Sequence, residues 1–121
     1  MSIGRKLLSE LVVKLVSESA SVREEGAELI SDRKNSLNIF ERRLLTRVLS
    51  LVAAVEVEEW AREAAINAIA ELHNQNVQPC DVASLLEIDS TILGPSELDY
   101  LNEIFDGNSM TSNEIANSHE K

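Results

Sequence analysis

Residues 22–30 read VREEGAELI and residues 61–69 read AREAAINAI, and the two segments align when the chain is shifted by 39 positions. Arg23 matches Arg62, Glu24 matches Glu63, and both segments end in isoleucine, while small or apolar residues fill several other columns. Similarity at a fixed offset is the sequence signature of a structural repeat. Apolar residues at steps of three and four within these segments predict helices. The chain is therefore expected to repeat a helical unit.

The same spacing predicts helices over nearly the whole chain. Ser21 with Glu24, and Asn38 with Glu41, have the spacing of capping boxes and are expected to begin the second and third helices. The third helix is indicated by an apolar stripe of Phe40, Leu44, Val48, Leu51, Val52 and Val55. Asp81 is expected to cap a short fifth helix, and Pro95 suits the first turn of a sixth. The six predicted helices cover residues 3–17, 21–30, 38–55, 56–72, 81–88 and 95–105.

Composition supports an all-α fold in a single domain. The chain has 121 residues, 44% of them hydrophobic, with 3% aromatics, four Gly and two Pro. Such a mixture favours helices over a β-sandwich, which needs more aromatic and turn residues. We expect one helical domain over residues 1–106 and a disordered polar tail over residues 107–121.

Cysteine content and hydropathy bear on the compartment. Cys80 is the single cysteine, which excludes an intrachain disulfide and fits a reducing compartment. Glu10 and Lys14 interrupt the apolar run near the N-terminus, so neither a signal peptide nor a membrane span is predicted. The expected location is the cytoplasm, without membrane association.

Charge is distributed unevenly along the chain. The net charge is −10, yet residues 1–62 contain ten acidic and ten basic residues, whereas residues 63–120 contain eleven acidic residues and no Lys or Arg. A field of one sign repels nucleic acid and attracts basic proteins. The sequence therefore predicts a basic protein partner and no nucleic-acid ligand.

Residues 22–27 and 60–65 resemble the Val-Arg-x-x-Ala-Ala start of the second helix in HEAT-type repeats. The resemblance covers roughly residues 3–106, and the third unit departs from it because residues 96–101 lack the arginine. It implies about six helices in three antiparallel pairs, stacked as a short right-handed α-solenoid whose second helices line one concave face. In size, charge and repeat style the chain is also similar to small helical immunity proteins of contact-dependent and polymorphic toxin systems.

The sequence offers little for catalysis. His73 and His119 are the only histidines, Cys80 has no neighbouring cation in sequence, and no phosphate loop, metal-ligand spacing or serine elbow is present. Glu59 and Glu63 share a helix face, but such pairs usually face water. No enzymatic activity, metal or cofactor is predicted.

Acidic side chains on the second helices are the candidate partner-binding residues. Equivalent positions 39 residues apart place Glu24 with Glu63 and Asp32 with Glu71, and the third unit would extend the surface. Carboxylates in this arrangement pair with the Lys and Arg of a nucleic acid-degrading enzyme. The predicted partner-binding set is Glu24, Glu28, Asp32, Glu59, Glu63, Asn67, Glu71, Glu97, Asp99, Tyr100 and Glu103.

Two aromatic residues have open roles at this stage. Trp60 is expected to fill the seam between two helix pairs, and Tyr100 suits an interface as well as the core.

The expected function is immunity, by binding a cognate basic toxin domain. The alternative is a HEAT-like adaptor or assembly factor that binds a basic segment of a housekeeping complex.

Overall fold

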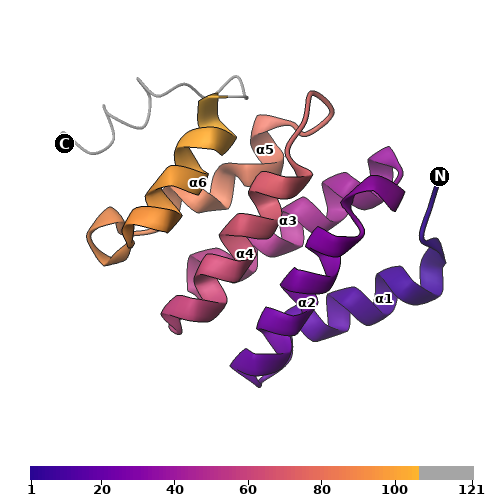
Figure 1. Cartoon of the computed structure of the whole chain (residues 1–121), viewed down its shortest axis with the longest axis horizontal. Helices are drawn as coiled ribbons and strands as arrows, with labels where there is room; N and C mark the ends of the chain where they lie inside the picture. Colours follow the sequence, from indigo (N-terminus) through magenta and orange to yellow (C-terminus); the bar gives the residue numbers. More distant parts are fainter. Residues whose placement is uncertain (107–121) are drawn as a thin grey trace.

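The computed structural model describes residues 1–106, which form helices and no strand (Figure 1). The predicted all-α class and the six helices are confirmed. The predicted tail, residues 107–121, lies outside the described residues. The α-helices are α1 (Gly4–Leu15), α2 (Ala20–Asp32), α3 (Ile39–Val55), α4 (Glu59–Leu72), α5 (Pro79–Val82) and α6 (Pro95–Asp106), and the 3₁₀ helices are η1 (Lys34–Ser36), η2 (Ala83–Glu87) and η3 (Ser90–Ile92).

The helices pack in two rows. One row contains α2, α4 and α6, with α4 in contact with both neighbours (Figure 1). The other row contains α1, α3 and the short α5–η2 segment, with α3 between its two neighbours. Further contacts of α1 with α2 and of α3 with α4 join the rows, so α3 and α4 lie at the centre of the molecule.

The core lies between the two rows and is aliphatic apart from Phe105. Its fully buried side chains include Leu15, Ile30, Leu49, Ile66 and Ile104. Burying one such side chain stabilises the fold by about 1.5–3 kcal/mol.

Gly26 marks the closest approach of α1 and α2. A Cβ at Gly26 would lie 3.0 Å from the Lys14 Cβ and 3.3 Å from Leu15 Cδ2. The two backbones could not approach this closely with a larger residue at this position.

Two of the predicted helix starts agree with the structure and two differ. Pro95 is the first residue of α6, as predicted. The capping box of Asn38 and Glu41 is confirmed at α3. The prediction for α2 is wrong, because Ser19 is the N-cap and its hydroxyl accepts a hydrogen bond from the Val22 amide. Asp81 is not an N-cap either: α5 begins at Pro79, and Asp81 accepts a hydrogen bond from the Gln78 amide. In both cases the helix begins earlier than the prediction.

The apolar stripe that indicated the third helix faces the core only in part, through Val48 and Val52. Leu45 and Leu49 of α3 are completely buried, whereas Phe40, Leu51 and Val55 are 67%, 59% and 76% exposed. The helix itself is confirmed. Its apolar residues cover most of its circumference, so the stripe gave the correct period but not the buried side.

Candidate acidic groove on α2, α4 and α6

A groove of about 510 Å³ crosses the row formed by α2, α4 and α6. Three α2 acids lie on one face of that helix because their spacing of four residues is close to one helical turn. On α4, Glu63 and Asn67 have the same spacing. The lining residues are Glu24, Glu28, Ser31, Asp32, Trp60, Glu63, Ala64, Asn67 and Tyr100.

The groove carboxylates have no intramolecular partner within residues 1–106. No hydrogen bond or ion pair reaches Glu24, Glu28, Asp32 or Glu63 from the described residues. Carboxylates that share a concave surface repel one another, and low-dielectric walls concentrate their field. The groove is therefore a negative surface that a cationic group would stabilise.

Several cations on and beside these helices are paired outside the groove. Lys14 pairs with Glu25 and Lys34 pairs with Glu71, while Arg42 donates to the carbonyls of Leu72 and Lys34. The remaining ion pairs are those of Arg23 with Glu56, of Arg43 and Arg47 with Asp81, and of Arg62 with Glu97. None of these cations neutralises the groove.

Six of the eleven predicted partner-binding residues line this groove: Glu24, Glu28, Asp32, Glu63, Asn67 and Tyr100. Glu59, Asp99 and Glu103 are exposed but lie outside the groove lining. Glu71 is on α4 and is paired with Lys34. The structure thus brings together the three acids of α2 with Glu63 and Asn67 of α4, but not the acids of α6.

Glu97 differs most from its expected position. The residue is 1% exposed, and its side chain accepts hydrogen bonds from Arg62 Nε at 2.7 Å and from the Gly94 amide at 3.0 Å. A carboxylate buried in this way cannot contact a partner. Its position in the first turn of α6 explains the burial, because Arg62 of α4 and the free amides there both reach it.

Arg62 and Arg23 occupy equivalent positions and make equivalent contacts. Arg23 Nη1 donates to the carbonyl of Ser17, six residues earlier, and its Nε lies 2.6 Å from Glu56 Oε1. Arg62 Nη1 donates to the carbonyl of Glu56, also six residues earlier, and its Nε pairs with Glu97. Each arginine therefore links the turn before its own helix to a carboxylate farther along the chain. The shift of 39 positions aligned these arginines, but the sequence did not indicate their partners.

Buried carboxylates in the row of α1, α3 and α5 are also satisfied. Burial opposes ionisation of Glu41, but hydrogen bonds from Ser2, Asn38, Ile3 and Gly4 outweigh it, and the pKa of Glu41 lies below its ordinary value.

Asp81 is held in the same way. Burial opposes its ionisation, while Arg43, Arg47 and the Gln78 amide lower the pKa of Asp81. These carboxylates stabilise the fold and are not free to bind a partner.

Two aromatic rings line the groove beside the acids. Trp60 at the start of α4 is 44% exposed, so it does not simply fill a seam, and Tyr100 of α6 is half-buried. Sequence reasoning missed Ser31 and Ala64, which also line the groove; the Ser31 hydroxyl is buried and has no partner among the described residues. Aromatic faces next to carboxylates suit guanidinium groups, which stack and pair at once.

Other kinds of site are not found in the described part of the chain. Within residues 1–106 no cluster of His, Cys, Asp and Glu is arranged to hold a metal ion. No helix in the same range is long and apolar enough to cross a bilayer. Comparisons with known proteins found no matching family model, no similar curated protein and no similar solved structure.

Proposed function

We propose that this chain is an immunity protein that binds and neutralises a basic toxin domain through the acidic groove on α2, α4 and α6. The expected toxin is an enzyme that degrades nucleic acid, because such an enzyme carries the Lys and Arg that the groove would pair with. The proposal involves no catalysis by this chain.

A single observation carries the proposal: Glu24, Glu28, Asp32 and Glu63 converge on one groove that no Lys or Arg lines, while the arginines of α2 and α4 are paired elsewhere. Leaving four carboxylates unpaired together costs stability through repulsion. A cationic partner would remove that cost and gain charge-assisted hydrogen bonds.

The arrangement of the helices supports a short right-handed HEAT-like solenoid of three antiparallel pairs. Two rows of helices and the equivalent contacts of Arg23 and Arg62 are what such a repeat would produce. In this interpretation α2, α4 and α6 are the second helices of their pairs, and the groove lies on the face that solenoids use for binding.

The test begins with the capture of binding proteins from a lysate of the native host by this chain. The bound proteins are washed at low and then at high salt. The purified captured domain is then titrated against the wild-type chain and against the double variant Glu24→Gln/Glu63→Gln. We expect at least a tenfold rise in Kd for the variant and a smaller dependence of its Kd on salt. Co-expression of the wild-type chain should restore growth to cells that produce the captured domain.

The matched control is Glu10→Gln/Glu18→Gln, which changes the net charge equally at exposed acids outside the groove. Its Kd should stay close to the wild-type value. Equal weakening by both variants would mean that only total charge matters and would contradict the groove. Capture of housekeeping subunits without any effect on growth would favour the HEAT-like adaptor instead.

A further inference from the structure

The acidic groove contains the one tryptophan and the one tyrosine of the chain. Trp60 lies on the face of α4 that also carries Glu63 and Asn67, since these positions follow it by three and seven residues. Trp60 is 44% exposed, and Tyr100 lines the same groove from α6. An exposed aromatic ring and a carboxylate are therefore neighbours on one side of α4.

The carboxylates opposite this face come from α2. Glu24, Glu28 and Asp32 follow one another at steps of one helical turn, and α2 packs directly against α4. Packed helices have axes about 8–10 Å apart, so one planar cation between them can reach carboxylates of both. Glu24 and Glu63 are half-buried, so part of their hydration is already lost. A cation that binds them must also give up water.

Other polar groups of the groove lack a partner as well. Within residues 1–106 no hydrogen bond reaches the side chains of Asn67 or Tyr100. The hydroxyl oxygen of Ser31 is buried and is also without a partner in that range. A buried polar atom without a hydrogen bond is costly and calls for an explanation. The groove thus offers more acceptors than the described residues satisfy, which points to a ligand rich in N–H donors.

An arginine side chain suits these groups better than a lysine side chain. A guanidinium is planar, carries a fixed fork of N–H donors, is more weakly hydrated than an ammonium and stacks on aromatic faces. The lysine ammonium is a compact and strongly hydrated point charge. A groove that combines half-buried carboxylates with an exposed indole therefore favours the guanidinium.

We propose that the groove binds an arginine side chain of the partner protein, with the guanidinium stacked on Trp60 and paired with Glu63 of α4 and Glu24 of α2. Farther along the groove, Ser31 and Asn67 accept N–H donors of the same segment. The inference rests on the proposed function and specifies the chemistry of the partner. Arginine, rather than lysine, is the side chain that anchors it.

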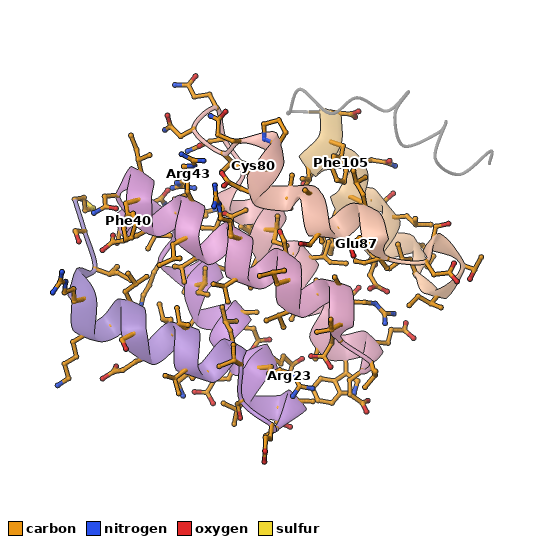
Figure 2. All side chains as sticks on the ribbon, turned by 180° about the vertical axis from the view of Figure 1, so that it is seen from behind. Arg23, Phe40, Arg43, Cys80, Glu87 and Phe105 are labelled. Carbon is orange, nitrogen blue, oxygen red and sulfur yellow. The ribbon has the colours of Figure 1, made fainter. Side chains whose placement is uncertain are left out.

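The opposite side of the molecule combines an aromatic ring with cations instead. Figure 2 shows Phe40 on that side, and Arg43 beside Cys80. Phe40 is 67% exposed and lines a hollow with Arg43 and Arg47, both of which pair with Asp81. Phe40 is therefore a matched control for Trp60, because it is an exposed aromatic residue beside cations and not beside free carboxylates.

Two capped peptides of equal length and charge are the probes, with glycine alternating with arginine in one and with lysine in the other. Calorimetric titration of the full chain gives a Kd for each peptide. We expect the arginine peptide to bind at least about fivefold more tightly. Trp60 is the single tryptophan, so a change in its emission on binding shows that the peptide reaches the groove.

Three variants separate stacking from charge. Trp60→Leu should weaken binding of the arginine peptide about fivefold and change that of the lysine peptide little, because the guanidinium gains most from the ring. Phe40→Leu should leave both Kd values unchanged. Glu24→Gln/Glu63→Gln should weaken both peptides, because they carry the same charge. Circular dichroism checks that each variant folds.

The outcomes distinguish this inference from the proposed function. Equal Kd values for the two peptides, both raised in Glu24→Gln/Glu63→Gln, would overturn the arginine assignment and leave the acidic groove and the immunity proposal standing. A preference for arginine that persists in Trp60→Leu would contradict stacking on the indole, and binding of neither peptide would also overturn the inference. A preference that depends on Trp60, without capture of any toxin, would support the inference and count against the immunity function.

Discussion

Two groups of carboxylates in this chain have the same chemistry and opposite environments. Glu56, Asp81 and Glu97 are buried, and each accepts bonds from an arginine of another helix. Glu24, Glu28, Asp32 and Glu63 line an open groove without a cation. The first group lies in turns or first helical turns, where free amides are available, and the second lies within helices. Position along the helix, rather than the count of acids, separates residues that stabilise the fold from residues available to a partner.

The largest effect should follow from breaking the most buried pair. Arg62→Met leaves the Glu97 carboxylate, whose side chain is 2% exposed, without its cation. Removing one member of a buried pair costs about 3–5 kcal/mol. The free energy of unfolding from urea titration should fall by that amount.

The double variant Arg62→Met/Glu97→Met is the control for Arg62→Met, because it removes the unpaired Glu97 carboxylate as well as the arginine. It should regain much of the lost stability. A double variant less stable than Arg62→Met would show that Glu97 contributes through its bond with the Gly94 amide more than through Arg62.

A smaller effect is expected in the acid range for the pair of Arg23 and Glu56. Hydrogen bonds from Arg23 lower the pKa of Glu56 more than burial raises it. The folded state therefore binds fewer protons than the unfolded state below the ordinary value of 4.5. The stabilisation is complete above that pH and is lost as the pH falls through the folded pKa.

Glu56→Gln lacks this titration, so its stability should decline less steeply than that of the wild type as the pH falls below about 4.5. Urea midpoints at a series of pH values measure the two slopes. Glu10→Gln, on the exposed side of α1, should keep the wild-type slope. Parallel curves for Glu56→Gln and the wild type would contradict the assignment of acid sensitivity to this pair.

Much of the fold was predictable because local signals are strong in this chain. The helix period, the capping box of Asn38 and Glu41, and Pro95 at the first turn of α6 all concern neighbouring residues. The start of α2 was not predicted because Ser19 and Ser21 are both acceptable caps. The buried side of α3 was not predicted because leucines and valines lie around most of the helix, so periodicity does not distinguish the core from an exposed face.

The candidate site was also predictable only in part. The shift of 39 positions placed Glu24 and Glu63 at equivalent positions, and both line the groove. The sequence showed that the third unit departs from the repeat, but it did not show that Glu97 would be buried. Glu97 comes two positions after the residue equivalent to Glu56, and it is bound by Arg62 instead of facing solvent. Pairing between distant residues depends on tertiary contacts, which a local pattern does not specify.

Substitution of the groove carboxylates should have the smallest effect on stability, in contrast to Arg62→Met. Glu24→Gln/Glu63→Gln removes two repelling charges and no intramolecular bond, so the free energy of unfolding should stay within about 0.5 kcal/mol of the wild type, on the stabilising side. Salt should stabilise the wild type more than this variant, because at about 0.1 M ions screen charges over roughly 10 Å. Urea titrations at low and high salt measure both quantities, and Glu10→Gln/Glu18→Gln should respond to salt as the wild type does. A clear loss of stability in the groove variant would mean that these carboxylates support the fold, and the distinction between the two groups would then fail.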